Sequence, residues 1–312
     1  MTVMTHASAT WREIASQPAT WEHALGLPGL AAPVTGSTGE RVLYLGCGTS
    51  AFMAQSIANL RERAGRGESH WAFASEVPSA RNYDRVVAIT RSGTTTEAIE
   101  ALAAYAGRAR RVAVCAVQDM PVTNEADEMV LLDFADETSV VQTRFPTTLL
   151  MAVRAALGED VLHLPSACAS ALAAGPGLDP TAYGHFVILG RGWAIGLAHE
   201  SALKIRETAQ AWAESYPALD YRHGPIAVAH EGTLVWMHGP ADRGLSEDIR
   251  AVSATPWHVD LDPMISLVLT QQLAVELAAA RGLDPDHPRA LTRSVVLNPP
   301  HNDIPSHAGV PS

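Results

Sequence analysis

The sequence predicts an α/β protein in which two parallel β-sheets are each flanked by helices, giving two three-layer αβα units. Of its 312 residues, 47% are hydrophobic and 18% are charged, which is typical of a folded chain with an ample core. Apolar runs of β-forming residues alternate with helical patterns, and this alternation indicates parallel sheets. The same order of elements recurs in the second half, and the length also favours two domains.

The repeat is visible in the order of strands, glycine turns and helices. Residues 41–60 predict a buried strand, a tight turn at Gly46-Cys47-Gly48 and a helix, and residues 185–205 predict the same around Gly190 and Gly192. The next corresponding strands are residues 85–90 and 232–239, and the corresponding long helices are residues 145–158 and 262–282. Two copies of one pattern favour a duplicated domain over a solenoid.

Domain boundaries follow from the remaining segments. Residues 110–118 and 128–134 predict further strands in the first sheet, and residues 164–180 hold a short helix and a Gly/Pro-rich run. This run places the boundary near Pro165. We therefore expect a helical lead-in over residues 1–30, a first domain over 31–165, a second over 166–298 and a C-terminal tail over 299–312.

Composition narrows the functional class. The net charge of −11 argues against nucleic-acid or anionic-membrane partners. Three widely spaced cysteines, Cys47, Cys115 and Cys168, give neither a disulfide framework nor a zinc pattern. The first 25 residues carry charges and resemble no signal peptide, and we expect no stretch of 18 apolar residues able to span a membrane. We expect a cytoplasmic protein that acts on a small molecule.

A hydroxyl-rich segment, residues 86–99 (VVAITRSGTTTEAI), lies between a predicted strand and helix. Ligands of parallel sheets bind at the carboxyl ends of strands, and a helix N-terminus offers free N–H groups to anions. Arg91 supplies a positive charge, and Gly93 supplies a flexible backbone position. Four hydroxyls come from Ser92, Thr94, Thr95 and Thr96. A helix cap requires only one hydroxyl, so the segment predicts a site for a phosphate monoester.

Several segments resemble the SIS (sugar isomerase) domain family. TRSGTTTEA resembles its S-x-S-G-x-T phosphate loop, and LGCGTSAF its first-strand motif. ETSVVQTRFPTTLL, HESALKIRETAQAWAESY and YRHGPIAV are similar to further motifs of the isomerase domain of glucosamine-6-phosphate synthase and of stand-alone amino-sugar-phosphate isomerase/deaminases. The resemblance covers most of the chain. It implies two tandem SIS domains, each flavodoxin-like, and a homodimer with shared active sites that binds a sugar phosphate.

The resemblance also implies the residues of the site. Phosphate and substrate would be held by Gly48, Thr49, Ser50, Thr90, Arg91, Ser92, Gly93, Thr95, Val140 and Gln142, with Arg293 as a candidate C-terminal contact. Glu200, Lys204 and Glu207 share one helix face, a spacing also common among surface ion pairs. Within the motif, Glu207 would be the enolisation base, assisted by Lys204. His223 would open the sugar ring in the neighbouring subunit's site.

The chain also departs from the pattern of the synthase. We expect no glutaminase domain, because no such segment or N-terminal cysteine nucleophile precedes the isomerase motifs. Arg293 replaces a lysine that forms an imine with the open sugar, and an arginine cannot do this. Either Lys204 forms the imine instead, or the reaction needs no enzyme-bound imine. Arg91 replaces a glutamine, and Gln142 replaces a small residue. Both changes alter the sugar-facing edge, so the substrate can differ from a glucosamine phosphate.

The leading hypothesis is an aldose–ketose isomerase or deaminase of amino-sugar metabolism that acts on a hexosamine or hexose phosphate, similar to glucosamine-6-phosphate deaminase. The alternatives are a deglycase of phosphorylated fructosamines and a non-catalytic sugar-phosphate-binding regulator. We expect no cofactor, since Gly46-Cys47-Gly48 lacks the third glycine of a dinucleotide loop. We expect no metal either, since the ligand types His301, Asp303 and His307 lie in the predicted tail.

Overall fold

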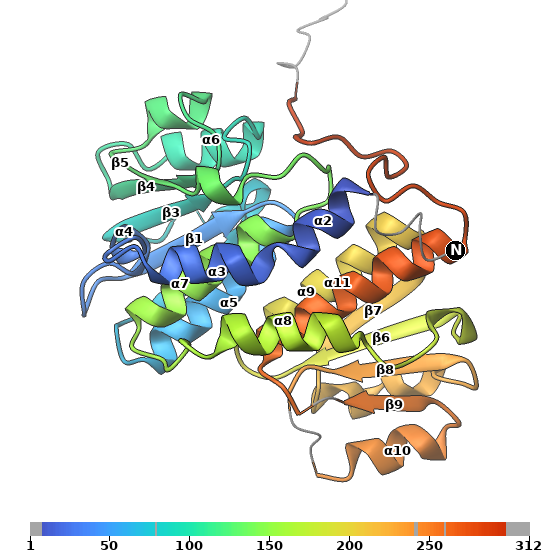
Figure 1. Ribbon diagram of the computed structural model, residues 1–312. Coiled ribbons are helices and arrows are strands. Elements are labelled where there is room, and N and C mark those ends of the chain that lie inside the picture. Colours follow the sequence, from blue (N-terminus) through green and yellow to red (C-terminus); the bar gives the residue numbers. More distant parts are fainter. Residues whose placement is uncertain (1–7, 79, 240–242, 259, 298–312) are drawn as a thin grey trace, which may run out of the picture.

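Two parallel β-sheets, each flanked by helices, form the protein (Figure 1). The computed structural model describes residues 8–78, 80–239, 243–258 and 260–297. The first sheet has the strand order β2-β1-β3-β4-β5 and the second the order β7-β6-β8-β9. Every neighbouring pair of strands is parallel. The predicted α/β class is therefore confirmed.

The elements have the following bounds. The first sheet consists of β1 (Val42–Gly46), β2 (Ser69–Phe73), β3 (Arg85–Ile89), β4 (Arg110–Cys115) and β5 (Glu128–Leu131). The second consists of β6 (His185–Gly190), β7 (Trp212–Pro217), β8 (Thr233–Met237) and β9 (Thr255–His258). The helices are α2 (Ala9–Ala15), α3 (Gln17–Leu25), α4 (Ala32–Thr35), α5 (Thr49–Arg63), α6 (Thr96–Ala103), α7 (Arg144–Ala156), α8 (Leu164–Ala174), α9 (Ala194–Ala209), α10 (Leu245–Ala251) and α11 (Pro263–Ala280).

The central strands are those that the sequence predicts best. Every residue of β1, β3, β6 and β8 is buried, because helices cover both faces of a parallel sheet. Such strands are continuous apolar runs, and all four are where the sequence predicts them. The sequence analysis did not identify β2, β7 and β9. All three are edge strands with partly exposed residues, so they lack an apolar run.

The two glycine turns have the same backbone form. At Gly46 and Gly190 an added Cβ would lie 2.6 Å from Ser50 Cβ and 2.1 Å from the Ala194 carbonyl oxygen, respectively. At Gly48 and Gly192 the φ angles are +52° and +53°, in the region that favours glycine. In each turn the first glycine allows the strand and helix to approach closely, and the second reverses the chain.

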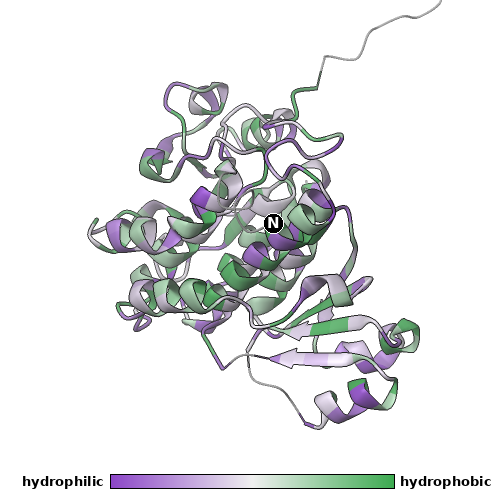
Figure 2. Ribbon diagram, turned by 45° about the vertical axis from the view of Figure 1, so that its right-hand side comes forward, coloured by the Kyte–Doolittle hydropathy of each residue, from purple (hydrophilic) through white to green (hydrophobic). Residues whose placement is uncertain are grey.

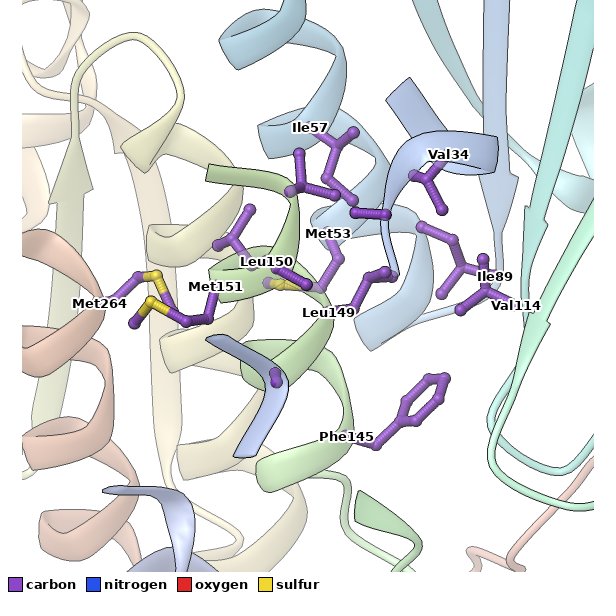
Figure 3. Packing of buried hydrophobic residues seen from close by; sticks show 14 of the residues in the cluster. Val34, Met53, Ile57, Ile89, Val114, Phe145, Leu149, Leu150, Met151 and Met264 are labelled. Atoms are coloured by element: carbon purple, nitrogen blue, oxygen red, sulfur yellow. The ribbon is translucent and has the colours of Figure 1, made fainter. Parts of the chain in front are cut away.

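The core is continuous across the predicted boundary at Pro165. Helix α7 lies between the first sheet and α11, and its two faces pack in opposite directions (Figure 3). Leu149 lies on the side of Ile89 and Val114, whereas Met151 points toward Met264 of α11. The lead-in helices join this core: Trp21 of α3 is buried and donates a 3.0 Å hydrogen bond to Thr147 of α7. Helix α11 also contributes Leu269, Leu273 and Leu277 to the cluster that covers the second sheet, so it links the cores of the two halves.

Helix α11 corrects one expectation from the sequence. With 18 residues it is long and apolar enough to cross a membrane, and we expected no such stretch. However, 78% of the helix is buried inside the protein, and it packs against α9, α8 and α2. A helix that is apolar on all sides is typical of a protein core as well as of a membrane span. Figure 2 shows hydrophobic residues concentrated on the helices at the centre of the molecule.

A close contact between α5 and α9 joins the two halves beside the glycine turns. An added Cβ at Gly196 of α9 would lie 2.2 Å from Ser56 Oγ and 2.3 Å from the Phe52 carbonyl oxygen. Ser56 also donates a 2.8 Å hydrogen bond to the Trp193 carbonyl. Because these helices start from the carboxyl ends of β1 and β6, their contact brings the ligand-binding edges of the two sheets together.

Candidate active site

The hydroxyl-rich segment forms a buried loop between β3 and α6. Thr90, Arg91 and Ser92 are buried, and Gly93 has a φ of +67° with Met120 packed where a side chain would stand. Ser92 Oγ lies 3.0 Å from Thr94 Oγ1, and Thr90 Oγ1 lies 3.4 Å from Thr95 Oγ1. These hydroxyls gather at the N-terminus of α6, where N–H groups and the helix dipole favour an anion. We call residues 90–96 the phosphate cradle.

A small cavity lies beside the phosphate cradle. It is lined by predicted site residues from four separate segments of the sequence. Its volume is about 30 Å³, which accommodates one or two water molecules. The predicted site residues that line it are Ser50, Thr90, Arg91, Ser92, Thr95, Gln142 and Arg293. The turn after β1, the cradle, the loop before α7 and the C-terminal segment therefore meet at one place. Cys47 lines the same cavity, and burial raises the pKa of its thiol to about 11.

The predicted proton-transfer residues lie at the contact between the two halves. The Lys204 ammonium of α9 donates hydrogen bonds to Glu207 Oε2 at 2.5 Å and to Thr49 Oγ1 of α5 at 3.1 Å. Its nitrogen also lies 3.3 Å from Glu200 Oε1. Glu200 and Lys204 are fully buried, while the Glu207 side chain is 18% exposed. Since Thr49 adjoins Ser50 of the cavity, this charged cluster lies next to the phosphate cradle.

Burial and charge adjust the protonation states in this cluster. Burial raises the pKa of Glu200 to about 8, despite the nearby Lys204 charge. Burial alone would lower the pKa of Lys204, but the carboxylates of Glu200 and Glu207 outweigh it and raise that pKa. Lys204 is therefore an ammonium at neutral pH. A buried cluster with such shifts is a candidate for acid–base chemistry.

Arg91 lies at the cavity, but its guanidinium contacts protein groups. It donates hydrogen bonds to the Ser139 carbonyl at 2.9 Å and the Arg293 carbonyl at 3.1 Å. It also lies 3.8 Å from the carboxylate of Glu137, which is fully buried. We expected this charge to face a phosphate. The position instead ties the cradle to the loop before α7, where the Val140 carbonyl accepts a 3.4 Å hydrogen bond from the same guanidinium.

Arg293 lies apart from the lysine cluster. Its guanidinium donates to Asp136 Oδ1 at 2.6 Å and to the Glu137 carbonyl. In this arrangement it faces the loop before α7. The neighbouring Gln142 has a buried side-chain oxygen without a hydrogen-bond partner among the described residues. This oxygen is a polar group that a ligand in the cavity could satisfy.

His223 is the one predicted catalytic residue that the single chain leaves outside the cluster. It ends a short 3₁₀ turn (Asp220–His223) after β7, and Gly224 follows with a φ of +136°. The side chain is exposed. Among the described residues no contact joins it to Lys204 or Glu207. Its role in a neighbouring subunit's site stays a prediction.

Three residues near the site were not assigned roles from the sequence. Glu200 shares the helix face of Lys204 and Glu207, so its spacing was a signal, but only burial distinguishes it from a surface carboxylate. Glu137 lies in a motif that we quoted, but its pairing with Arg91 depends on tertiary contacts. Ser294 contacts the cradle from 200 residues away, and no local pattern indicates this.

The residues that could ligate a metal were considered in the sequence analysis, which expected no metal site. His301, Asp303 and His307 lie outside the described residues. Within the described part of the chain, no group of three or more His, Cys, Asp or Glu side chains is placed to hold a metal ion.

The chain is similar in sequence to known proteins whose names refer to sugar phosphates. Glutamine–fructose-6-phosphate aminotransferase (isomerizing) from Aeropyrum pernix is 31% identical over 92% of this chain, and that from Acidithiobacillus ferridurans is 28% identical over 83%. The chain spans only 57% and 52% of these relatives' lengths.

Solved structures also resemble most of the chain. Glucosamine-6-phosphate deaminase from Thermotoga maritima matches 93% of this chain and 100% of its own, with a TM-score of 0.83 and 25% identity. Tagatose-6-phosphate ketose/aldose isomerase from Escherichia coli matches 95% and 97%, with a TM-score of 0.76. At 19% identity it supports the fold alone. Residues 37–157 match the SIS domain model, and this part of the chain therefore belongs to the SIS domain family.

Proposed function

We propose that the protein is an isomerase or deaminase of a hexose or hexosamine phosphate, similar to glucosamine-6-phosphate deaminase. One observation carries this proposal: Lys204 of the second half donates hydrogen bonds both to Thr49 of the first half, beside the phosphate cradle, and to Glu207. An anion held in the cradle would place the rest of an extended sugar along this contact. A carboxylate and an ammonium would then lie beside the carbon atoms that exchange a proton.

In the proposed reaction, Glu207 moves one proton between adjacent carbons of the open sugar. It removes the proton from C2 of an amino-aldose, and Lys204 stabilises the negative charge that develops on the C1 oxygen. The same carboxyl returns the proton to C1, a proton of the C2 amino group passes to the C1 oxygen, and an imine remains at C2. Water adds to C2 and ammonia departs, so the products are a ketose phosphate and ammonia. With a 2-hydroxy sugar, the same proton transfer gives simple isomerisation.

The contacts of Lys204 argue against an enzyme-bound imine. Imine formation requires a neutral amine, and the two flanking carboxylates raise the pKa of Lys204. Arg293, which replaces the lysine of the synthase, is engaged with Asp136. We therefore infer that the ring-opened substrate reacts without a covalent link to the protein.

We further propose that the second sheet belongs to a second SIS domain and that two chains share their sites. The strand order β7-β6-β8-β9 repeats the order of the first four strands of the first sheet, and the two glycine turns have matching φ angles. The exposed position of His223 supports a role in another subunit. Mixing inactive Glu207→Gln and His223→Ala chains would restore activity if Glu207 of one chain and His223 of the other act in the same site, because a mixed dimer then has one intact site. Absence of restored activity would contradict the sharing.

A coupled assay for ammonia and ketose phosphate tests the activity. Glucosamine 6-phosphate should yield both products, and a hexose phosphate should yield isomer alone. Release of an amino acid from a phosphorylated fructosamine would instead support the deglycase alternative. Binding without turnover across the panel would support a regulator. The ion-paired, largely buried acid–base cluster supports an enzyme, because a binding protein gains nothing from burying these charges.

A further inference from the structure

We propose that residues 293–297 form a strap that fills the phosphate cradle in the absence of substrate and that the substrate's phosphate displaces it. This inference rests on the proposed function and concerns the regulation of the same site. Figure 1 shows the C-terminal segment, in red, returning from the end of α11 to the first sheet. There the strap crosses the N-terminus of α6.

Ser294 of the strap occupies the position that suits an anion. Its Oγ lies 2.9 Å from Thr94 Oγ1, 3.1 Å from Ser92 Oγ and 3.4 Å from Thr95 Oγ1. These three hydroxyls are the donors that we assign to a phosphate oxygen. One serine hydroxyl therefore satisfies them in its place, so phosphate and strap cannot occupy the cradle together.

Backbone groups of the strap also use the polar groups at the start of α6. The Thr96 N–H donates to the Val295 carbonyl at 3.3 Å, and the Leu297 N–H donates to Thr96 Oγ1 at 2.9 Å. The first N–H groups of a helix have no partner within the helix, and an anion at this position would use them. Because the strap occupies these backbone and hydroxyl groups, an anion that uses them requires movement of the strap.

The strap is anchored at one end and weakly held at the other. Arg293 pairs with Asp136 at 2.6 Å, and its carbonyl accepts from Arg91. By contrast, the side chains of Val295, Val296 and Leu297 are 51%, 65% and 51% exposed. Little apolar surface is therefore lost when residues 294–297 lift. A charged phosphate makes stronger hydrogen bonds than a neutral hydroxyl, which favours the exchange.

Hydrogen exchange measured by mass spectrometry, with inorganic phosphate as the probe, tests the strap directly. We expect phosphate to slow exchange in residues 92–96 and to accelerate it in residues 293–297. Accelerated exchange of the Leu297 amide would report release from Thr96. If phosphate protects both segments, the strap closes over the anion and the proposal is wrong, although the phosphate site stands. If phosphate changes neither segment, both the strap and the proposed function are contradicted.

Two Ser294 variants should change the affinity for inorganic phosphate in opposite directions, which calorimetric titration can measure. Ser294→Ala removes the competing hydroxyl, and we expect phosphate to bind about fivefold more tightly. Ser294→Asp places a carboxylate in the cradle, and we expect binding at least tenfold weaker. Ser170→Ala, an exposed serine of α8, is the matched control and should leave the affinity unchanged. Weaker binding by Ser294→Ala would overturn the strap, because it would make Ser294 a phosphate ligand.

Discussion

The two glycine turns share a backbone but carry different chemistry. The first turn leads into Thr49 and Ser50, which are buried at the site. The second leads into Trp193, whose ring stacks on the Arg154 guanidinium at 4.8 Å. The catalytic candidates of the second half lie further along α9, at Glu200, Lys204 and Glu207. Under the proposed function, one half would bind the anion with neutral donors, while the other would supply charged groups for proton transfer.

The division has a physical basis. A phosphate is already negative, so hydroxyls and helix N–H groups suffice to hold it. Proton transfer instead needs a carboxylate near an ammonium in a dry environment. Placing both functions in one turn would let the carboxylate repel the phosphate. Separate turns that meet at the α5–α9 contact avoid this conflict.

Removing the base should give the largest effect. For Glu207→Gln we expect a loss of turnover of about 10³-fold, within the usual range for a general base. Incorporation of deuterium from D2O at C1 and C2, followed by NMR, should stop as well. Inorganic phosphate should still bind, because the cradle lies in the other half. Glu247→Gln on the exposed face of α10 is the control. Unchanged deuterium incorporation in Glu207→Gln would exclude this residue as the base.

Disturbing the close contact between α5 and α9 should give the next largest effect. Gly196→Ala places a methyl group 2.2 Å from Ser56 Oγ and 2.3 Å from a backbone oxygen of α5. We expect the free energy of unfolding in urea to fall by about 1–3 kcal/mol, with turnover reduced more than phosphate affinity. Gly184→Ala, where no atom lies within 4 Å of the added carbon, should be neutral. Equal stability of both variants would show that α5 and α9 do not need this close contact.

Removing one cradle hydroxyl should have a smaller and more selective effect. Thr95→Val keeps the shape of the side chain but deletes a hydrogen bond to an anion, so we expect KM to rise about tenfold. The value of kcat should change little, because the proton-transfer groups are untouched. Steady-state kinetics measures both parameters, with the exposed Thr38→Val as control. A fall in kcat at constant KM would contradict a role in phosphate binding.

The buried carboxyl of Glu200 should change how the free energy of unfolding depends on pH. Its pKa rises from 4.5 to about 8 on burial, so the folded protein retains a proton that the unfolded chain loses above pH 4.5. The stability that Glu200 contributes is complete below pH 4.5 and is lost as the pH rises to about 8. Relative to Glu200→Gln, the wild type should lose up to about 1.4 kcal/mol per pH unit in this interval. If plots of unfolding free energy against pH run parallel for the wild type and Glu200→Gln, the raised pKa is contradicted.

Sequence reasoning succeeded where local pattern and tertiary environment agree. The central strands and the hydroxyl loop are contiguous segments, and their residue types are sufficient to predict them. The edge strand β5 was predicted, but β2, β7 and β9 were missed, because partial exposure interrupts their apolar runs. The orientation of the Arg91 guanidinium toward Ser139 and the contact of Ser294 with Ser92 depend on residues far apart in the sequence. Only the folded chain reveals such pairings.

A crystal structure with bound fructose 6-phosphate would test the central claim most directly. The account predicts the phosphate within hydrogen-bond distance of the Ser92 and Thr95 hydroxyls, with C1 and C2 about 3–3.5 Å from the Glu207 carboxylate. Phosphate bound away from the cradle, or a sugar that extends from the cradle away from α9, would contradict it.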